Sequence, residues 1–74
     1  MTSHSEQLEQ ARQRVLETRR VAEAQRERVD RLSRQGQETS EAKSLLHSYE
    51  RTVAIFEDDF VRLSKELNPS LRLV

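Results

Sequence analysis

The sequence contains no cysteine, which excludes a disulfide framework and any thiolate metal site. One glycine, Gly36, and one proline, Pro69, leave two long stretches that are free of helix breakers. No apolar run approaches the length of a membrane-spanning helix, so we expect no membrane partner. The polar start, residues 1–6, lacks the apolar core of a signal peptide, and we therefore expect a cytoplasmic protein.

An excess of either charge is also missing. The chain carries 13 basic and 13 acidic residues, so no overall field draws it to nucleic acid or to anionic lipid. Charged residues make up 35% of the chain and aromatic residues 4%, a composition typical of long helices with much exposed surface. A chain of 74 residues forms one domain at most, and it has difficulty burying enough apolar surface alone.

The single glycine marks the break between two helical patterns. A glycine just past a helix end adopts the left-handed conformation easily, because it has no Cβ to clash there. We predict Thr39 as the N-cap of a second helix, with its hydroxyl accepting from free amides and Glu41 in the first turn. The short loop favours antiparallel neighbours. The alternative is one continuous bent helix.

Both halves of the chain repeat apolar or small residues at alternating steps of three and four, as a helix with one buried stripe does. We predict an all-α antiparallel two-helix hairpin, similar to a coiled coil, that occupies the single domain 1–74. Its helices cover residues 5–35 and 40–67, its turn covers residues 36–39, and Asn68-Pro69 ends the second helix. The two stripes form a predicted seam of Leu8, Ala11, Val15, Thr18, Ala22, Gln25, Val29 and Leu32 against Ala42, Leu46, Tyr49, Val53, Phe56, Phe60, Leu63 and Leu67.

Folding the chain at the glycine brings the two stripes together in a constant register. The numbers of each facing pair add up to 74 or 75, from Leu32 with Ala42 at the turn to Leu8 with Leu67 at the far end. Slim residues of the first helix face aromatic residues of the second, as interdigitated packing requires. Three charge pairs across the seam support this register: Arg19 with Glu57, Arg26 with Glu50, and Arg14 with Asp59.

A further set of uncharged residues lies beside the seam and on one side of the hairpin. We call it the lateral face, and it consists of Val21, Ala24, Leu45, Ser48, Thr52 and Ile55. The opposite side carries a thinner pair, Leu16 and Val61. Because two helices leave their seam half exposed, we expect the lateral face to self-associate, giving a homodimer that is a four-helix bundle. The alternative is a weak monomer with scattered surface apolar residues.

The last segment, residues 69–74, is more apolar than a solvated terminus. It either folds back in cis over the open end of the seam or docks in trans on another protein.

The first helix holds eight arginines, which points to nucleic-acid binding as an alternative function. Arg20, Arg31 and Arg34 would be the main members of such a surface. However, six acidic residues interleave the arginines, and no aromatic residue of this helix is available to stack on bases. We therefore do not expect nucleic acid to be the principal partner.

The sequence shows no glycine-rich phosphate loop, no activated nucleophile and no paired buried carboxylates. His47 and Glu50 supply one pair of metal ligands only, and we interpret His47 as a surface residue. We predict a non-enzymatic protein that has no catalytic residues, no cofactor and no metal site. Its expected role is that of a small interaction or regulatory module for another protein; an accessory piece of a larger assembly is a further alternative.

Three segments, residues 20–26, 32–39 and 42–46, resemble a group of small uncharacterised alphaproteobacterial helical-hairpin proteins. In these proteins a glycine-centred turn and then a threonine lie between two charged helices, as Gly36 and Thr39 do here. The resemblance covers about residues 20–67, and it departs at Gln37-Glu38, where His-Asp would be expected. It implies a bacterial helical hairpin and assigns neither an activity nor binding residues.

Overall fold

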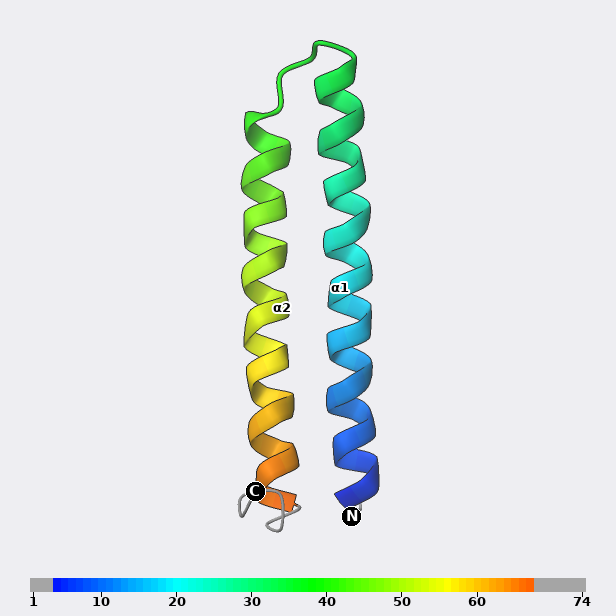
Figure 1. The fold of residues 1–74 in the computed structure, drawn as a ribbon, viewed down its shortest axis with the longest axis vertical. Coiled ribbons are helices and arrows are strands. Elements are labelled where there is room, and N and C mark those ends of the chain that lie inside the picture. The colour runs from blue at the N-terminus through cyan, green and yellow to red at the C-terminus, as the bar shows by residue number, and fades with distance from the viewer. Residues whose placement is uncertain (1–3, 68–74) are drawn as a thin grey trace.

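The computed structural model describes residues 4–67, which form two long helices and the turn between them. Helix α1 spans His4–Arg34 and helix α2 spans Ser40–Leu67, and the two run antiparallel beside each other (Figure 1). The predicted all-α hairpin is confirmed, with α1 beginning and ending one residue earlier than expected. The predicted apolar tail, residues 69–74, lies outside the described residues.

The hairpin is one helix thick. Its principal extents are 52 × 27 × 14 Å, and its smallest extent is close to the diameter of a single helix with side chains. The radius of gyration is 16.6 Å, whereas a compact domain of this length has about 11 Å. Within residues 4–67, no third layer therefore covers the outer sides of the two helices.

Every residue of the predicted seam is buried or half-buried, which confirms the membership of the two stripes. The buried members all belong to α1, and none of the residues of α2 reaches that degree of burial. The wide side chains of α2, such as Phe56 and Phe60, are only half-buried. The most buried seam residues are Ala11, Val15, Ala22, Gln25 and Val29.

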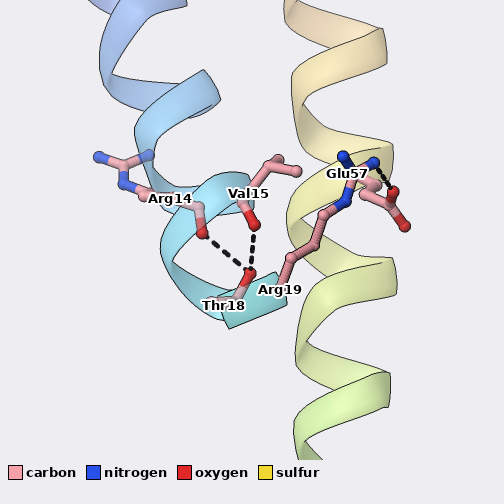
Figure 2. Close-up of polar contacts among 5 residues, drawn as sticks. All are labelled: Arg14, Val15, Thr18, Arg19 and Glu57. Carbon is pink, nitrogen blue, oxygen red and sulfur yellow. Dashed lines mark hydrogen bonds and ion pairs between the residues drawn. The ribbon is translucent and has the colours of Figure 1, made fainter. Parts of the chain in front are cut away.

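Two polar residues enter the seam from the middle of α1, and both have hydrogen-bond partners. Gln25 is only 7% exposed, and its Nε2 donates to the carbonyl oxygen of Ala42 across the seam at 2.9 Å. The Thr18 hydroxyl donates to the carbonyl oxygens of Arg14 (2.8 Å) and Val15 (3.1 Å) within its own helix (Figure 2). Neither residue therefore adds the cost of an unsatisfied buried polar group.

Gly36 ends α1 in the left-handed conformation, with a φ of 70°. Its N–H donates to the carbonyl oxygen of Ser33 (3.0 Å), and the N–H of Gln37 donates to that of Leu32 (2.9 Å). This pair of hydrogen bonds is the Schellman motif, which satisfies carbonyl groups that the end of a helix leaves free. The predicted glycine stop is confirmed.

The side chain that caps α2 is Glu38 and not Thr39. Thr39 does occupy the N-cap position, where its carbonyl oxygen accepts from the Lys43 amide (2.8 Å). Its hydroxyl accepts no hydrogen bond from the described residues, whereas Oε1 of Glu38 accepts from the Ser40 amide (2.6 Å). The glutamate side chain thus satisfies the first free amide of the helix from one residue further back. Hydrogen bonds from the Ser40 hydroxyl and amide lower the pKa of Glu38 below its ordinary value of 4.5.

We expect Gly36→Ala to lower the free energy of unfolding by roughly 1–2 kcal/mol, because an L-residue pays that amount in the left-handed region. A Cβ at this position would meet no atom within 4 Å, so the cost is one of backbone conformation alone. Urea unfolding followed by circular dichroism measures it. Gly36→Asn is the control and should cost less, since asparagine tolerates this conformation better; equal losses would contradict the explanation.

The lowered pKa of Glu38 predicts a pH-dependent contribution to stability. The ionised carboxylate stabilises the fold at pH values above the ordinary pKa of 4.5, and this contribution is lost as the pH falls through the lowered value. Glu38→Gln should therefore melt below the wild type at pH 7, and the gap should close towards pH 3. Glu27→Gln, an exposed position in the middle of α1, should show no such convergence. A gap for Glu38→Gln that is independent of pH would disprove the capping role.

Candidate interaction surface

One side of the seam is lined by two ion pairs that join the helices. An Nη atom of Arg19 pairs with Oε2 of Glu57, as Figure 2 shows, and Arg26 pairs with Glu50 at 2.9 Å. The hydrogen bond to Glu50 is the largest influence that raises the pKa of Arg26. Two of the three predicted cross-helix pairs are thus confirmed, and they fix which flank of α1 meets which flank of α2.

The third predicted pair, Arg14 with Asp59, does not form. Oδ1 of Asp59 instead accepts from Arg62 of its own helix at 2.7 Å, and Figure 2 shows the Arg14 side chain directed away from α2. Arg62 lies one turn from Asp59, so this contact needs no side chain to reach across the seam. The same preference for a partner three residues away on the same helix recurs in Glu9–Arg12 and Glu23–Arg26.

The lateral face lies on the flank of the seam away from the Arg19–Glu57 pair, as the heptad positions of its residues require. Its large aliphatic side chains remain open to solvent: Val21 is 46% exposed, Leu45 42% and Ile55 63%. Ala24 and Ser48 are also exposed, and Thr52 is half-buried. None of the six members is ionisable.

One of the two polar members of the lateral face, Thr52, already has a hydrogen bond within its own helix. The hydroxyl of Thr52 donates to the carbonyl oxygen of Ser48 at 3.1 Å, one turn earlier in α2. A covering surface would therefore not deprive the Thr52 hydroxyl of its hydrogen bond. The face combines exposed aliphatic groups with small side chains that allow close approach.

The opposite flank is a poorer apolar surface. Leu16 (38% exposed) and Val61 (48% exposed) border a shallow groove over the seam residues Val15 and Phe60. Three charged side chains line the same groove: Arg12, Arg19 and Glu57. Arg19 pairs with Glu57 and Arg12 with Glu9, so this groove is bordered by charged pairs, whereas no member of the lateral face is charged.

The arginines proposed for nucleic-acid contact make no ion pair with the described residues. Arg20, Arg31 and Arg34 are exposed on α1, outside the seam. Acidic residues separate them along the helix: Glu23 and Glu27 follow Arg20, and Asp30 precedes Arg31. They do not form a continuous basic stripe, so this surface lacks the electrostatic signature of a nucleic-acid-binding face.

Other classes of site find no support in the described part of the chain. Residues 4–67 contain no group of three or more His, Asp or Glu side chains placed to hold a metal ion. His47, interpreted from the sequence as a surface residue, is exposed on α2. Neither α1 nor α2 has the length and apolar content that crossing a membrane requires.

No protein-family model, curated protein or solved structure matches the chain. The resemblance to the alphaproteobacterial hairpin proteins stays a prediction. The interpretation of the surface therefore depends on the residues and contacts described above.

We predict that Arg19 and Glu57 are coupled by about 0.2–1 kcal/mol in a double-mutant cycle of alanine substitutions, the range of exposed ion pairs. Urea unfolding of the wild type, the two single variants and the double variant gives this value. The cycle for Arg14 and Asp59 is the matched control, and its coupling should be close to zero because these side chains do not meet. Comparable coupling in both cycles would contradict the observed pairing.

Proposed function

We propose that this protein is a non-enzymatic helical interaction module, and that it works as a homodimer in which two hairpins pack into a four-helix bundle. The observation that carries the proposal is the lateral face. It presents three well-exposed aliphatic side chains beside a seam that already has its own partner, so the hairpin itself does not account for them. A second layer of helices would bury them.

The thinness of the hairpin supports a second layer. In a body only 14 Å thick, each wide residue of the α2 seam is covered on one side alone. Small domains that cannot bury enough apolar surface commonly gain it by oligomerisation. Packing against the lateral face would cover the outer edges of seam residues such as Tyr49 and Phe56 as well as Leu45 and Ile55.

A second copy of the chain is the occupant that the composition favours. The net charge is zero, so two copies approach each other without overall repulsion. The lateral face is uncharged in all six members, and identical surfaces of this kind match each other in polarity. Two-fold symmetric dimers that use one patch on both subunits are the commonest protein assemblies.

The dimer leaves the outer faces of the helices free to contact another protein, in keeping with a regulatory or adaptor role. Nucleic-acid association is the alternative function. It has weaker support, because α2 engages Arg19 and Arg26 and acidic residues interrupt the free arginines of α1.

We expect the wild type to sediment at twice its chain mass of 8.7 kDa at micromolar concentration. Leu45→Glu combined with Ile55→Glu should raise the dissociation constant at least about a hundredfold, since each copy loses two aliphatic groups worth roughly 1.5–3 kcal/mol apiece when buried. Leu16→Glu combined with Val61→Glu is the matched control on the opposite flank and should remain dimeric. A stable, cooperatively folded wild-type monomer would refute the proposal.

A further inference from the structure

We infer that the two copies lie antiparallel, with α2 packed on α2 and α1 on α1 around a two-fold axis perpendicular to the helices. This inference rests on the proposed dimer and specifies its geometry. The axis passes the midpoint of Val21 and Ala24 in α1 and residue 50 in α2. Both positions follow from the spacing of the lateral-face residues.

The α2 part of the lateral face reads the same in both directions. Leu45, Ser48, Thr52 and Ile55 are separated by steps of three, four and three residues, so the row is symmetric about residue 50. When one copy is reversed, Leu45 comes to lie opposite Ile55 of the second copy. Ser48 likewise lies opposite Thr52 of the second copy, and every member of the row meets another member.

Side-chain size agrees with this arrangement. The two small residues occupy the centre of the row and the two large ones its ends, which lets the helices approach closely at the axis while aliphatic groups close both sides. The hydroxyl of Thr52, near the centre of the row, already donates to the carbonyl oxygen of Ser48 at 3.1 Å. Burial in the interface would therefore leave no unsatisfied hydrogen-bond donor at Thr52.

Charges on the α1 flank are complementary in the same arrangement. Val21 and Ala24 exchange places about their midpoint, and the next flanking residues outward, Glu17 and Arg28, exchange about the same point. Neither Glu17 nor Arg28 makes an ion pair with the described residues of its own hairpin. Each dimer would thus contain two Glu17–Arg28 pairs between copies.

One axis can serve both helices. The predicted seam register sets residues 22 and 23 of α1 level with about residue 52 of α2, two residues from the centre of the α2 row. Two residues of helix correspond to about 3 Å, which side-chain lean and a small tilt of the helices can absorb.

The other face-to-face arrangement, with the axis parallel to the helices, places α2 over α1 of the second copy. The predicted seam register would then set Leu45 near the level of Arg28 of the second copy, and Ile55 between the levels of Glu17 and Val21. Leu45 would meet an unpaired charge, which is unfavourable in a dry interface. The antiparallel arrangement avoids this contact.

Two like-charged appositions occur at the rim of the antiparallel dimer. Glu41 falls opposite Asp59 of the second copy, but Asp59 already pairs with Arg62 at 2.7 Å. Arg14 falls opposite Arg31 of the second copy, and Figure 2 shows that the Arg14 side chain is directed away from α2. Both contacts lie in solvent, where charge repulsion is weak.

The absence of cysteine makes a crosslinking experiment direct. The Leu45→Cys chain is mixed with the Ile55→Cys chain in a glutathione redox buffer, and disulfide-linked dimers are quantified on denaturing gels. We expect the mixed disulfide to exceed either self-disulfide at least about fivefold, because residues 45 of the two copies are about 15 Å apart, beyond disulfide reach. In a Ser48→Cys and Thr52→Cys mixture the two copies of either residue are offset along the helix by only about 6 Å, so we expect a smaller excess of the mixed disulfide there.

A mixture of Leu45→Cys with Arg28→Cys tests the parallel axis, and preferential crosslinking there would overturn the antiparallel geometry. Equal yields of self-disulfide and mixed disulfide would overturn it too. Sedimentation of the same variants under reducing conditions distinguishes a failure of the proposed dimer from a failure of its proposed orientation. Monomers would refute the dimer itself, whereas dimers with the wrong crosslinking pattern would refute its orientation alone. Circular dichroism confirms that each variant remains helical.

Discussion

The structure depends on one packing constraint: the slim residues of α1 must fit beneath the wide residues of α2 over the whole length of the hairpin. This fit places all of the most buried side chains in α1, while the aromatic residues of α2 remain half-buried. It also sets the register, because a shift of one residue would turn Ala22 and Val29 out of the seam. The ion pairs of Arg19 and Arg26 follow from that register and do not create it, since exposed pairs contribute little.

The sequence was sufficient to predict the hairpin, because its signals are local and repeated. Sixteen stripe residues, one glycine and one proline all predict the same two-helix hairpin. Each of the sixteen stripe residues is at least half-buried in the structure. The polar seam residue Gln25 was placed correctly by spacing alone. Its hydrogen bond to the Ala42 carbonyl could not have been predicted, because that bond depends on the reach of one side chain across the seam.

The errors concern flexible polar side chains that had more than one available partner. Asp59 was assigned to Arg14 across the seam, but Arg62 is nearer on the same helix. The side-chain cap of α2 is predicted at Thr39, but the Glu38 side chain provides it by accepting from the first amide of the helix. Spacing identifies which residues share a face, and it does not rank competing charge pairs of similar small energy. The lateral face was predicted from spacing too; its members are exposed or half-buried, and the dimer it suggests stays a proposal.

The left-handed glycine has a consequence for how the chain avoids exchanging halves with its neighbours. If the turn were straightened into continuous helix, α2 could leave its own α1 and satisfy the same sixteen stripe residues against another molecule, as in domain swapping. The energy difference between the closed and exchanged forms would then lie almost entirely in the five residues between Arg34 and Ser40. The φ of 70° at Gly36 and the hydrogen bonds around it favour the closed form, so the turn makes the seam intramolecular as well as ending a helix.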